Sequence, residues 1–385
     1  MSTPTPKNQM TRRQFLARTG ALGALGLSLP AFLAACGGSD SSSGGGSESL
    51  FFDNWPLYVD PTADGLTGTV DRFMAATGVA MTYGEGYNDN NEYFAKIQPL
   101  LGNGKPIEAD IIAPTFWMAG RLINLGWAEK LPKDQIPNFA NLEDGFVNPP
   151  WDPTGEYSMP WQGGVAGIAY NIDVTGREIK SVADLFDPEF KGKIGMLTEM
   201  RDTIGLICLS LGIDISTITS FDDAAPAFEK LAQAKNDGQI RAFTGNDYTD
   251  DLVSGNFAAC VGWSGDVLQL GKDSPNVRFV IPEEGGTRWC DTMILPKGVK
   301  NGSAAAKWMD FCYDPVQAAQ ITQYVQYLSP VKGVRDELAK LDPELAENPL
   351  LFPDDAANAR LRAFATLSED VEAKFDEEFS AITGA

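Results

Sequence analysis

The sequence predicts an α/β protein of two lobes with a ligand cleft between them. Short apolar runs alternate along the chain with segments of helical period, which is the pattern of a mostly parallel sheet covered on both faces. About 335 residues remain after an N-terminal leader and linker, too many for one comfortable core and close to two domains of usual size. Sheets of this kind bind ligands at the carboxyl ends of their strands.

The first 35 residues are typical of an export signal. The paired arginines Arg12 and Arg13 precede a weakly apolar stretch, rich in Gly and Ala, over residues 21–35. This order is typical of a twin-arginine signal. The stretch is too short and too interrupted to favour a membrane-spanning helix, which needs about 20 apolar residues. We therefore expect residues 1–35 to be removed.

A lipid anchor is expected directly after this signal. Leu33-Ala34-Ala35-Cys36 resembles the lipobox of bacterial lipoproteins, in which the cysteine is acylated. The alternative is an apolar signal core that happens to contain a cysteine. The chain that follows, to residue 49, is almost wholly Gly and Ser, and such a composition behaves as a flexible tether. Residues 36–49 are thus predicted to be a lipidated Cys36 and a linker.

Composition narrows the chemistry and the partners. The formal net charge of −22 becomes −26 without residues 1–35, because four basic residues and no acidic one leave. An acidic surface repels phosphate backbones, so nucleic acid is not an expected partner. The chain has no histidine, and its four later cysteines lack the close spacing of a metal site: Cys208, Cys260, Cys290 and Cys312. No metal or cofactor is predicted, and disulfide pairing stays open.

The expected elements of the first half alternate between strand and helix. Gly78 ends the first helix, because glycine readily adopts the left-handed conformation of a helix C-terminus. We expect strands at 50–52, 79–83 and 109–113, and helices over 66–74, over 93–101 and in a segment that ends near Gly126.

A second alternating set follows a proline-rich break at residues 148–153. No internal repeat is evident, and no long heptad run suggests a coiled coil. We expect strands at 165–170, 193–197, 257–262, 278–281 and 292–295, helices over 203–211 and 224–234, and a largely helical tail from residue 303.

Three clusters place aromatic and acidic or polar residues beside predicted strands. They are 54–58, directly after the strand at 50–52; 263–266, directly after 257–262; and 289–291, just before 292–295. An aromatic face attracts an ammonium group and packs against methylenes, while a carboxylate forms charge-assisted hydrogen bonds with it. A diamine needs such a site at each end. The recurrence therefore indicates a site for an organic cation.

Each cluster also has a purely structural interpretation. A tryptophan beside a strand suits core packing, and Asp266 suits a helix cap. Further aromatic candidates are the segment Thr115-Phe116-Trp117, after Pro114, and the segment 324–327. Gly163-Gly164 and Gly285-Gly286 are expected to form turns or to permit a close approach of the backbone, since no phosphate loop, dinucleotide fingerprint or nucleophile motif accompanies them. The chain is not expected to be an enzyme.

With these residues placed, the chain resembles the spermidine/putrescine-binding proteins of bacterial polyamine importers. The resemblance runs from about residue 50 to the C-terminus. It rests on Phe52-Asp53-Asn54-Trp55 with Tyr58, Ala109-Asp110-Ile111-Ile112-Ala113-Pro114-Thr115, Asn138-Phe139-Ala140-Asn141-Leu142, Tyr157-Ser158-Met159-Pro160-Trp161, Asp184-Leu185-Phe186-Asp187-Pro188-Glu189-Phe190-Lys191-Gly192, Val261-Gly262-Trp263-Ser264-Gly265-Asp266, Glu284-Gly285-Gly286-Thr287-Arg288-Trp289-Cys290-Asp291 and Tyr327-Leu328-Ser329-Pro330.

The resemblance implies a fold and a set of site residues. The fold is the two-lobed type II periplasmic binding protein architecture, with residues 50–163 and 292–337 in lobe 1 and residues 164–291 and 338–385 in lobe 2. Tryptophans would line an aromatic box and aspartates would bind amino groups. The ligand-binding residues so implied are Trp55, Tyr58, Thr115, Trp117, Asp202, Trp263, Asp266, Trp289, Asp291 and Tyr327.

Departures from the family pattern bear on the ligand. Leu57 stands where spermidine binders typically carry a glutamate, Met200 replaces another acid, and the region near Ala365 lacks a glutamine. Fewer acids suggest fewer ammonium groups. Retention of Asp266 and Asp291 resembles a putrescine-type site more than a spermidine-type site.

The resemblance also implies partners and a location. The protein would be a monomer, anchored through Cys36 to the outer face of the cytoplasmic membrane, that delivers a polyamine to ABC permease subunits. Three alternatives stay open. Tryptophans and carboxylates also suit a sugar or a different small organic cation. Paired carboxylates such as Asp266 and Asp291 suit an extracellular hydrolase.

Overall fold

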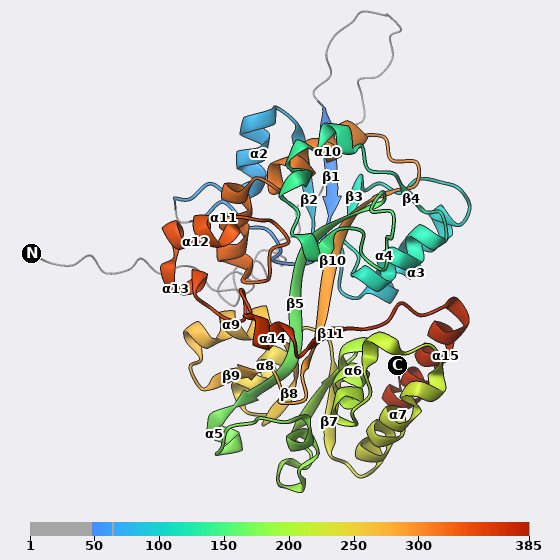
Figure 1. The fold of residues 1–385 in the computed structure, drawn as a ribbon, viewed down its shortest axis with the longest axis vertical. Coiled ribbons are helices and arrows are strands. Elements are labelled where there is room, and N and C mark those ends of the chain that lie inside the picture. The colour runs from blue at the N-terminus through green and yellow to red at the C-terminus, as the bar shows by residue number, and fades with distance from the viewer. Residues whose placement is uncertain (1–47, 64, 385) are drawn as a thin grey trace, which may run out of the picture.

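The computed structural model of the chain describes residues 48–63 and 65–384. The predicted signal, Cys36 and nearly all of the predicted linker lie outside this range. Within it, two α/β lobes share one sheet of eleven strands, and two long strands, β5 (Ser158–Asn171) and β10 (Gly286–Pro296), run through both lobes (Figure 1). The predicted two-lobed α/β fold is confirmed.

The strand order explains how the two lobes are joined. The order is β2-β1-β3-β10-β5-β8-β6-β7, with β4 and β11 on β10 and β9 on β5. The outer pairs, β1 with β2 and β3, and β6 with β7 and β8, are parallel. The pairs β3–β10, β10–β5 and β5–β8 are antiparallel. The expectation of a mostly parallel sheet is therefore wrong at its centre, because β5 and β10 run in opposite directions.

The first lobe contains most elements before β5. Its strands and helices are β1 (Ser49–Asp53), α2 (Thr69–Thr77), β2 (Ala80–Gly84), α3 (Asn90–Leu101), β3 (Ile111–Ile112), α4 (Phe116–Asn124) and β4 (Ala128–Glu129), followed by the 3-10 helices η1 (Lys133–Gln135), η2 (Pro137–Asn141) and η3 (Asp144–Phe146). The predicted helix end at Gly78 is confirmed, since that residue is left-handed with φ 73°. The predicted strand at 109–113 shortens to two residues.

Most elements of the second lobe lie between β5 and β10 in the sequence. They are α5 (Ile172–Thr175), η4 (Val182–Phe186), η5 (Pro188–Phe190), β6 (Ile194–Leu197), α6 (Met200–Ser210), η6 (Ile215–Thr217), α7 (Phe221–Asn236), β7 (Ile240–Thr244), α8 (Tyr248–Ser254), β8 (Ala259–Trp263), α9 (Ser264–Asp273) and β9 (Val277–Val280). The expected strands at 165–170 and 292–295 are parts of the longer β5 and β10. The cluster 289–291 consequently lies inside a strand and not before one.

The tail returns first to one lobe and then to the other. It comprises α10 (Gly302–Cys312), α11 (Pro315–Val325), α12 (Val334–Leu341), α13 (Pro343–Ala346), α14 (Asp355–Asn358), β11 (Leu361–Ala363) and α15 (Glu369–Thr383). Helix α10 packs on β1 and α2, whereas α15 packs on α7 in the other lobe. The prediction of a largely helical tail is confirmed.

Each lobe has an aromatic core. In the first, Phe73 contacts Trp308 edge-on with ring centroids 5.2 Å apart, and Phe52 contacts the same indole at 5.9 Å. In the second, Phe375 of α15 contacts Phe228 of α7 at 5.2 Å. Such pairs add about 0.5–1.5 kcal/mol each beyond the burial of their area. The tail therefore closes the core of both lobes.

Three further features of the described residues are their cysteines, their potential metal ligands and the apolar character of their helices. The four cysteines there are free and buried. Across 48–63 and 65–384, no group of three or more His, Cys, Asp or Glu side chains is arranged to hold a metal ion. No helix in the same ranges is both long and apolar enough to cross a membrane.

Gly195 of β6 provides a test of the packing in the second lobe. A Cβ at this position would lie 2.5 Å from the ring of Phe257 and 2.9 Å from the Cβ of Cys260. We expect Gly195→Ala to lower the free energy of unfolding, measured in urea, by about 1–3 kcal/mol, the usual cost of overpacking. Gly302→Ala is the control, because a Cβ there meets nothing within 4 Å. Equal stability of the Gly195 variant and the wild type would contradict this packing.

Candidate functional site

A cavity lined by residues of both lobes contains all the predicted binding residues. Its volume is about 870 Å³, including space open to solvent. The first lobe contributes Trp55, Tyr58, Thr115 and Trp117; the second contributes Asp202, Trp263 and Asp266; β10 contributes Trp289 and Asp291; and the segment after α11 contributes Tyr327. The structure thus brings together ten residues that are as far as 272 positions apart in the sequence, from Trp55 to Tyr327.

Asp291 is the most deeply buried acid of the cavity, with 2% of its surface exposed. Its carboxylate accepts hydrogen bonds from the Tyr58 hydroxyl at 2.9 Å and the Thr115 hydroxyl at 2.7 Å. No lysine or arginine among the described residues forms an ion pair with it. Burial raises the pKa of Asp291 to about 7, with a smaller contribution from the charge of Asp202, because these two hydroxyls compensate only part of the lost hydration.

Asp266 occupies the first turn of α9 but is not simply a helix cap. One carboxylate oxygen accepts from the Tyr327 hydroxyl at 2.9 Å, and the other accepts from the Tyr248 hydroxyl at 3.2 Å. Tyr248 is fully buried and its hydroxyl also accepts from the Trp263 amide at 3.1 Å. The sequence analysis missed Tyr248, since no local pattern links α8 to this carboxylate.

Asp202 holds the tryptophan of the cluster 263–266 in place. Its carboxylate accepts from the Trp263 indole Nε1 at 2.8 Å and from the Thr287 hydroxyl at 2.5 Å. Burial raises the pKa of Asp202 to about 6. The neighbouring Arg201 is engaged elsewhere: it pairs with Glu372 of α15 at 2.5 Å, and its guanidinium carbon lies 3.8 Å from the centre of the Trp117 ring. Arg201 therefore orients Trp117 and does not neutralise Asp291.

Glu199 also lines the cavity, and the sequence analysis did not include it among the binding residues. It is the N-cap of α6, where its side chain accepts from the Arg201 amide. Burial raises the pKa of Glu199 to about 8, helped by the charges of Asp202 and Asp89 and opposed by Arg201. Its position three residues before Asp202, which the family resemblance did implicate, was the available signal.

An aromatic wall runs along one side of the cavity. Successive ring centroids lie 6.5 Å apart for Trp55 and Tyr58, 5.8 Å for Tyr58 and Tyr327, and 5.0 Å for Tyr327 and Trp289. The Trp289 ring lies against Gly164 of β5, where a Cβ would come within 2.5 Å of the indole. The predicted close approach at Gly164 is therefore present, and it seats Trp289.

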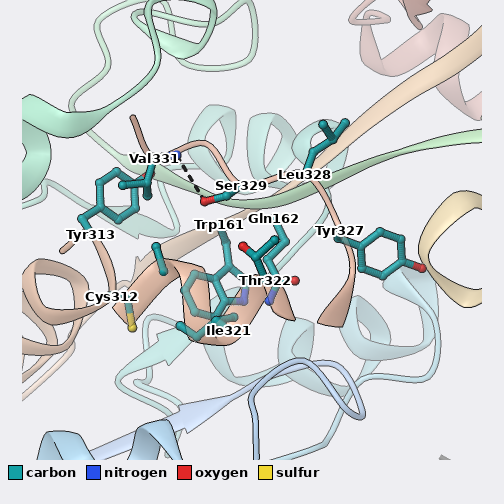
Figure 2. A pocket seen from close by; sticks show the side chains of 11 residues that line it. Trp161, Gln162, Cys312, Tyr313, Ile321, Thr322, Tyr327, Leu328, Ser329 and Val331 are labelled. Atoms are coloured by element: carbon teal, nitrogen blue, oxygen red, sulfur yellow. Dashed lines mark hydrogen bonds between the residues drawn. The ribbon is translucent and has the colours of Figure 1, made fainter. Parts of the chain in front are cut away.

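Figure 2 shows a second hollow, which is lined by residues that include Tyr327 of the aromatic wall. It is smaller, about 280 Å³ including open space, and Tyr327 borders both hollows. Its walls come from Trp161, Tyr313, Ile321 and other aromatic, aliphatic or neutral polar side chains, with no acidic residue among the described residues that line it. It therefore offers a cation no carboxylate.

The larger cavity combines the groups that an organic cation requires. Buried carboxylates are held by hydroxyl and indole donors, so they remain available as acceptors for a charged donor. The adjacent aromatic faces attract positive charge and bury methylenes. This arrangement can hold ammonium groups separated by an apolar chain.

Comparisons with known proteins cover most of the chain. Residues 68–353 match the family described as bacterial extracellular solute-binding protein. The spermidine/putrescine-binding periplasmic protein of Escherichia coli (strain K12) is 27% identical over 309 residues, which are 80% of this chain and 84% of that protein. The putrescine-binding periplasmic protein PotF of the same organism is 26% identical over 333 residues, 82% of this chain and 85% of that protein.

Solved structures share the fold. The crystal structure of the spermidine/putrescine ABC transporter substrate-binding protein PotD from Streptococcus pneumoniae superposes with a TM-score of 0.74 at 25% identity, covering 88% of this chain and 99% of that chain. The putative spermidine/putrescine ABC transporter from Listeria monocytogenes has a TM-score of 0.75 at 24% identity, covering 87% and 99%.

The raised pKa of Asp291 makes a prediction about stability without ligand. Its folded pKa of about 7 exceeds an unfolded value of about 3.9, so the stability that the protonated acid contributes is complete below pH 4 and is lost as pH rises through 7. We expect Asp291→Asn to raise the free energy of unfolding by about 1–3 kcal/mol at pH 8. The gain should shrink as pH falls to 5. Urea unfolding at four pH values checks this, and a gain independent of pH would contradict it.

Proposed function

The chain belongs to the family of bacterial extracellular solute-binding proteins, and we propose that it captures a polyamine between its lobes and delivers it to the permease of an ABC importer. It is a solute-binding protein and not an enzyme. The observation that carries the proposal is Asp291, a buried carboxylate with hydroxyl partners next to the aromatic wall, which pairs with no cation in the described part of the chain. An ammonium group of the ligand would supply the missing positive charge.

A diamine fits the two carboxylates beside the middle of the aromatic wall better than a longer polyamine does. Asp291 lies beside Tyr58, and Asp266 lies beside Tyr327. Because the Tyr58 and Tyr327 rings are neighbours, methylenes between two ammonium groups would pack on them. At the position where spermidine binders typically carry a glutamate, this chain has the buried Leu57. A putrescine-like ligand is therefore proposed in preference to spermidine.

Binding is proposed to proceed by closure of the lobes. Contacts to both lobes would favour a closed state over an open one. We assign residues 50–163 and 292–337 to lobe 1 and residues 164–291 and 338–385 to lobe 2. Helix α12 spans the last of these boundaries and packs on α11, so the chain is expected to cross after its C-terminal end.

Location and assembly follow from the same proposal. The two Escherichia coli relatives named above are called periplasmic. We propose that this chain also works outside the cytoplasm, as a monomer held to the outer face of the cytoplasmic membrane through lipidated Cys36. Mass spectrometry of the membrane-extracted protein would detect acylation of this cysteine, and an unmodified Cys36 would exclude the anchor.

Calorimetric titration tests the ligand directly. Purified protein, checked for ligand retained from the cells, would be titrated with putrescine, cadaverine, spermidine and spermine. We expect putrescine or cadaverine to bind more tightly than the two longer polyamines, because the site is proposed to hold two ammonium groups. Tighter binding of spermidine would contradict the diamine preference. Silence from all four, with binding of an oligosaccharide, would replace the polyamine proposal by the sugar alternative.

Removal of the Asp291 carboxylate tests the residue on which the proposal depends. We expect Asp291→Ala to weaken the binding of the preferred diamine by about 2–4 kcal/mol, because a buried ammonium group would lose its charged partner. Asp173→Ala is the control, since it removes the same charge from an exposed position on α5, outside the cavity lining. An affinity unchanged from the wild type would remove Asp291 from the site.

A further inference from the structure

The aromatic wall begins at a strained turn. Trp55 and Tyr58 flank Pro56 and Leu57, and Leu57 has a φ of +63°. Proline before a residue of positive φ is the arrangement of a type II turn, whose second central position normally holds glycine or asparagine. Leucine is disfavoured there, because its Cβ comes too close to the following carbonyl oxygen. Something in the surrounding structure must therefore stabilise this conformation.

Glu85 supplies that stabilisation from the next loop. Its carboxylate Oε1 accepts a hydrogen bond from the Leu57 backbone N–H at 2.9 Å. Glu85 directly follows β2, and β2 is paired with β1, which leads into the turn. Glu85 does not line the cavity. Its contact with the site is through the backbone of the turn.

The turn sets the direction of two ligand-facing side chains at once. Before it, the Trp55 indole Nε1 donates to the Ala113 carbonyl at 2.8 Å. After it, the Tyr58 hydroxyl donates to Asp291, and the Tyr58 carbonyl accepts from the Gln162 side chain at 2.8 Å. A change of φ at Leu57 would rotate one of these anchored residues relative to the other. The conformation of this turn therefore determines the distance and orientation between the Trp55 and Tyr58 side chains.

We propose that Glu85 is a positioning residue for the ligand site: by holding Leu57 in its left-handed conformation, it sets Trp55 and Tyr58 for binding. This inference rests on the proposed function, because its readout is ligand affinity. It adds a residue outside the cavity and assigns it a role through the backbone and not through its charge. Gln is therefore expected to replace Glu85, since its carbonyl oxygen can accept the same hydrogen bond.

The test compares Glu85 variants by calorimetric titration with the diamine that the wild type prefers. Glu85→Ala should weaken binding about five-fold, which corresponds to a hydrogen bond of about 1 kcal/mol. Glu85→Gln should stay within about two-fold of the wild type. Glu108→Ala is the charge control, because Glu108 is exposed and lies outside the cavity lining. An Ala variant with wild-type affinity would overturn the proposal.

A second background separates positioning from long-range attraction. Glycine adopts positive φ without the penalty that leucine has, so in a Leu57→Gly protein the loss caused by Glu85→Ala should fall below about two-fold. If Glu85 acted by charge, Gln would weaken binding as much as Ala, and the loss would persist in the Leu57→Gly background and diminish with added salt. Either of these results would overturn the positioning role. Failure of the wild type to bind any of the four polyamines would instead reject the proposed function.

Discussion

The antiparallel pairing of β5 with β10 is the constraint on which both the lobes and the cavity depend. These strands run through both lobes, and their register sets Trp289 opposite Gly164 and Asp291 opposite Gln162. Just beyond this point the register shifts, because Thr292 pairs with Pro160 and leaves Trp161 as an extra residue. Such bulges bend and twist a strand and are frequent beside functional sites. Asp291 is thereby held on β10, a strand that both lobes share.

Stability and binding make opposite demands on the buried acids. A lysine or arginine placed beside Asp291 would compensate its desolvation, but it would also occupy the position of a ligand cation. Hydroxyls from Tyr58 and Thr115 are a compromise, because they hold the carboxylate in place and leave its charge uncompensated. Arg201 shows the same separation. Although it lines the cavity, its ion pair is with Glu372, on the side of α15. The uncompensated negative charge of Asp291 lowers the stability of the protein without ligand, and the same charge would attract the cation of the proposed ligand.

The sequence predicted local elements better than long-range ones. Apolar periodicity located β1, β2 and β6 within a residue or two, but β5 and β10 were shortened because Pro160, the paired glycines and Trp289 do not form a typical strand pattern. The ten predicted binding residues line one cavity, and the prediction rested on aromatic and acidic residues that adjoin strand ends and match a family pattern. Tyr248 and Glu85 act only through tertiary contacts, with Asp266 and with the Leu57 amide, so no spacing in the sequence could indicate them.

Two carboxylates of the cavity accept hydrogen bonds from different elements of the chain. Asp291 is held from the first lobe, by Tyr58 and Thr115, whereas the bond from Tyr327 to Asp266 joins the segment after α11 to α9 in the second lobe. This bond already joins parts of both proposed lobes. It would therefore reduce the conformational entropy that is lost when the lobes close on a ligand. Tyr327 also packs between Tyr58 and Trp289, so one side chain links the aromatic wall to the carboxylate of Asp266. In the proposed diamine complex, packing of the methylenes and pairing of the charge would be coupled through Tyr327.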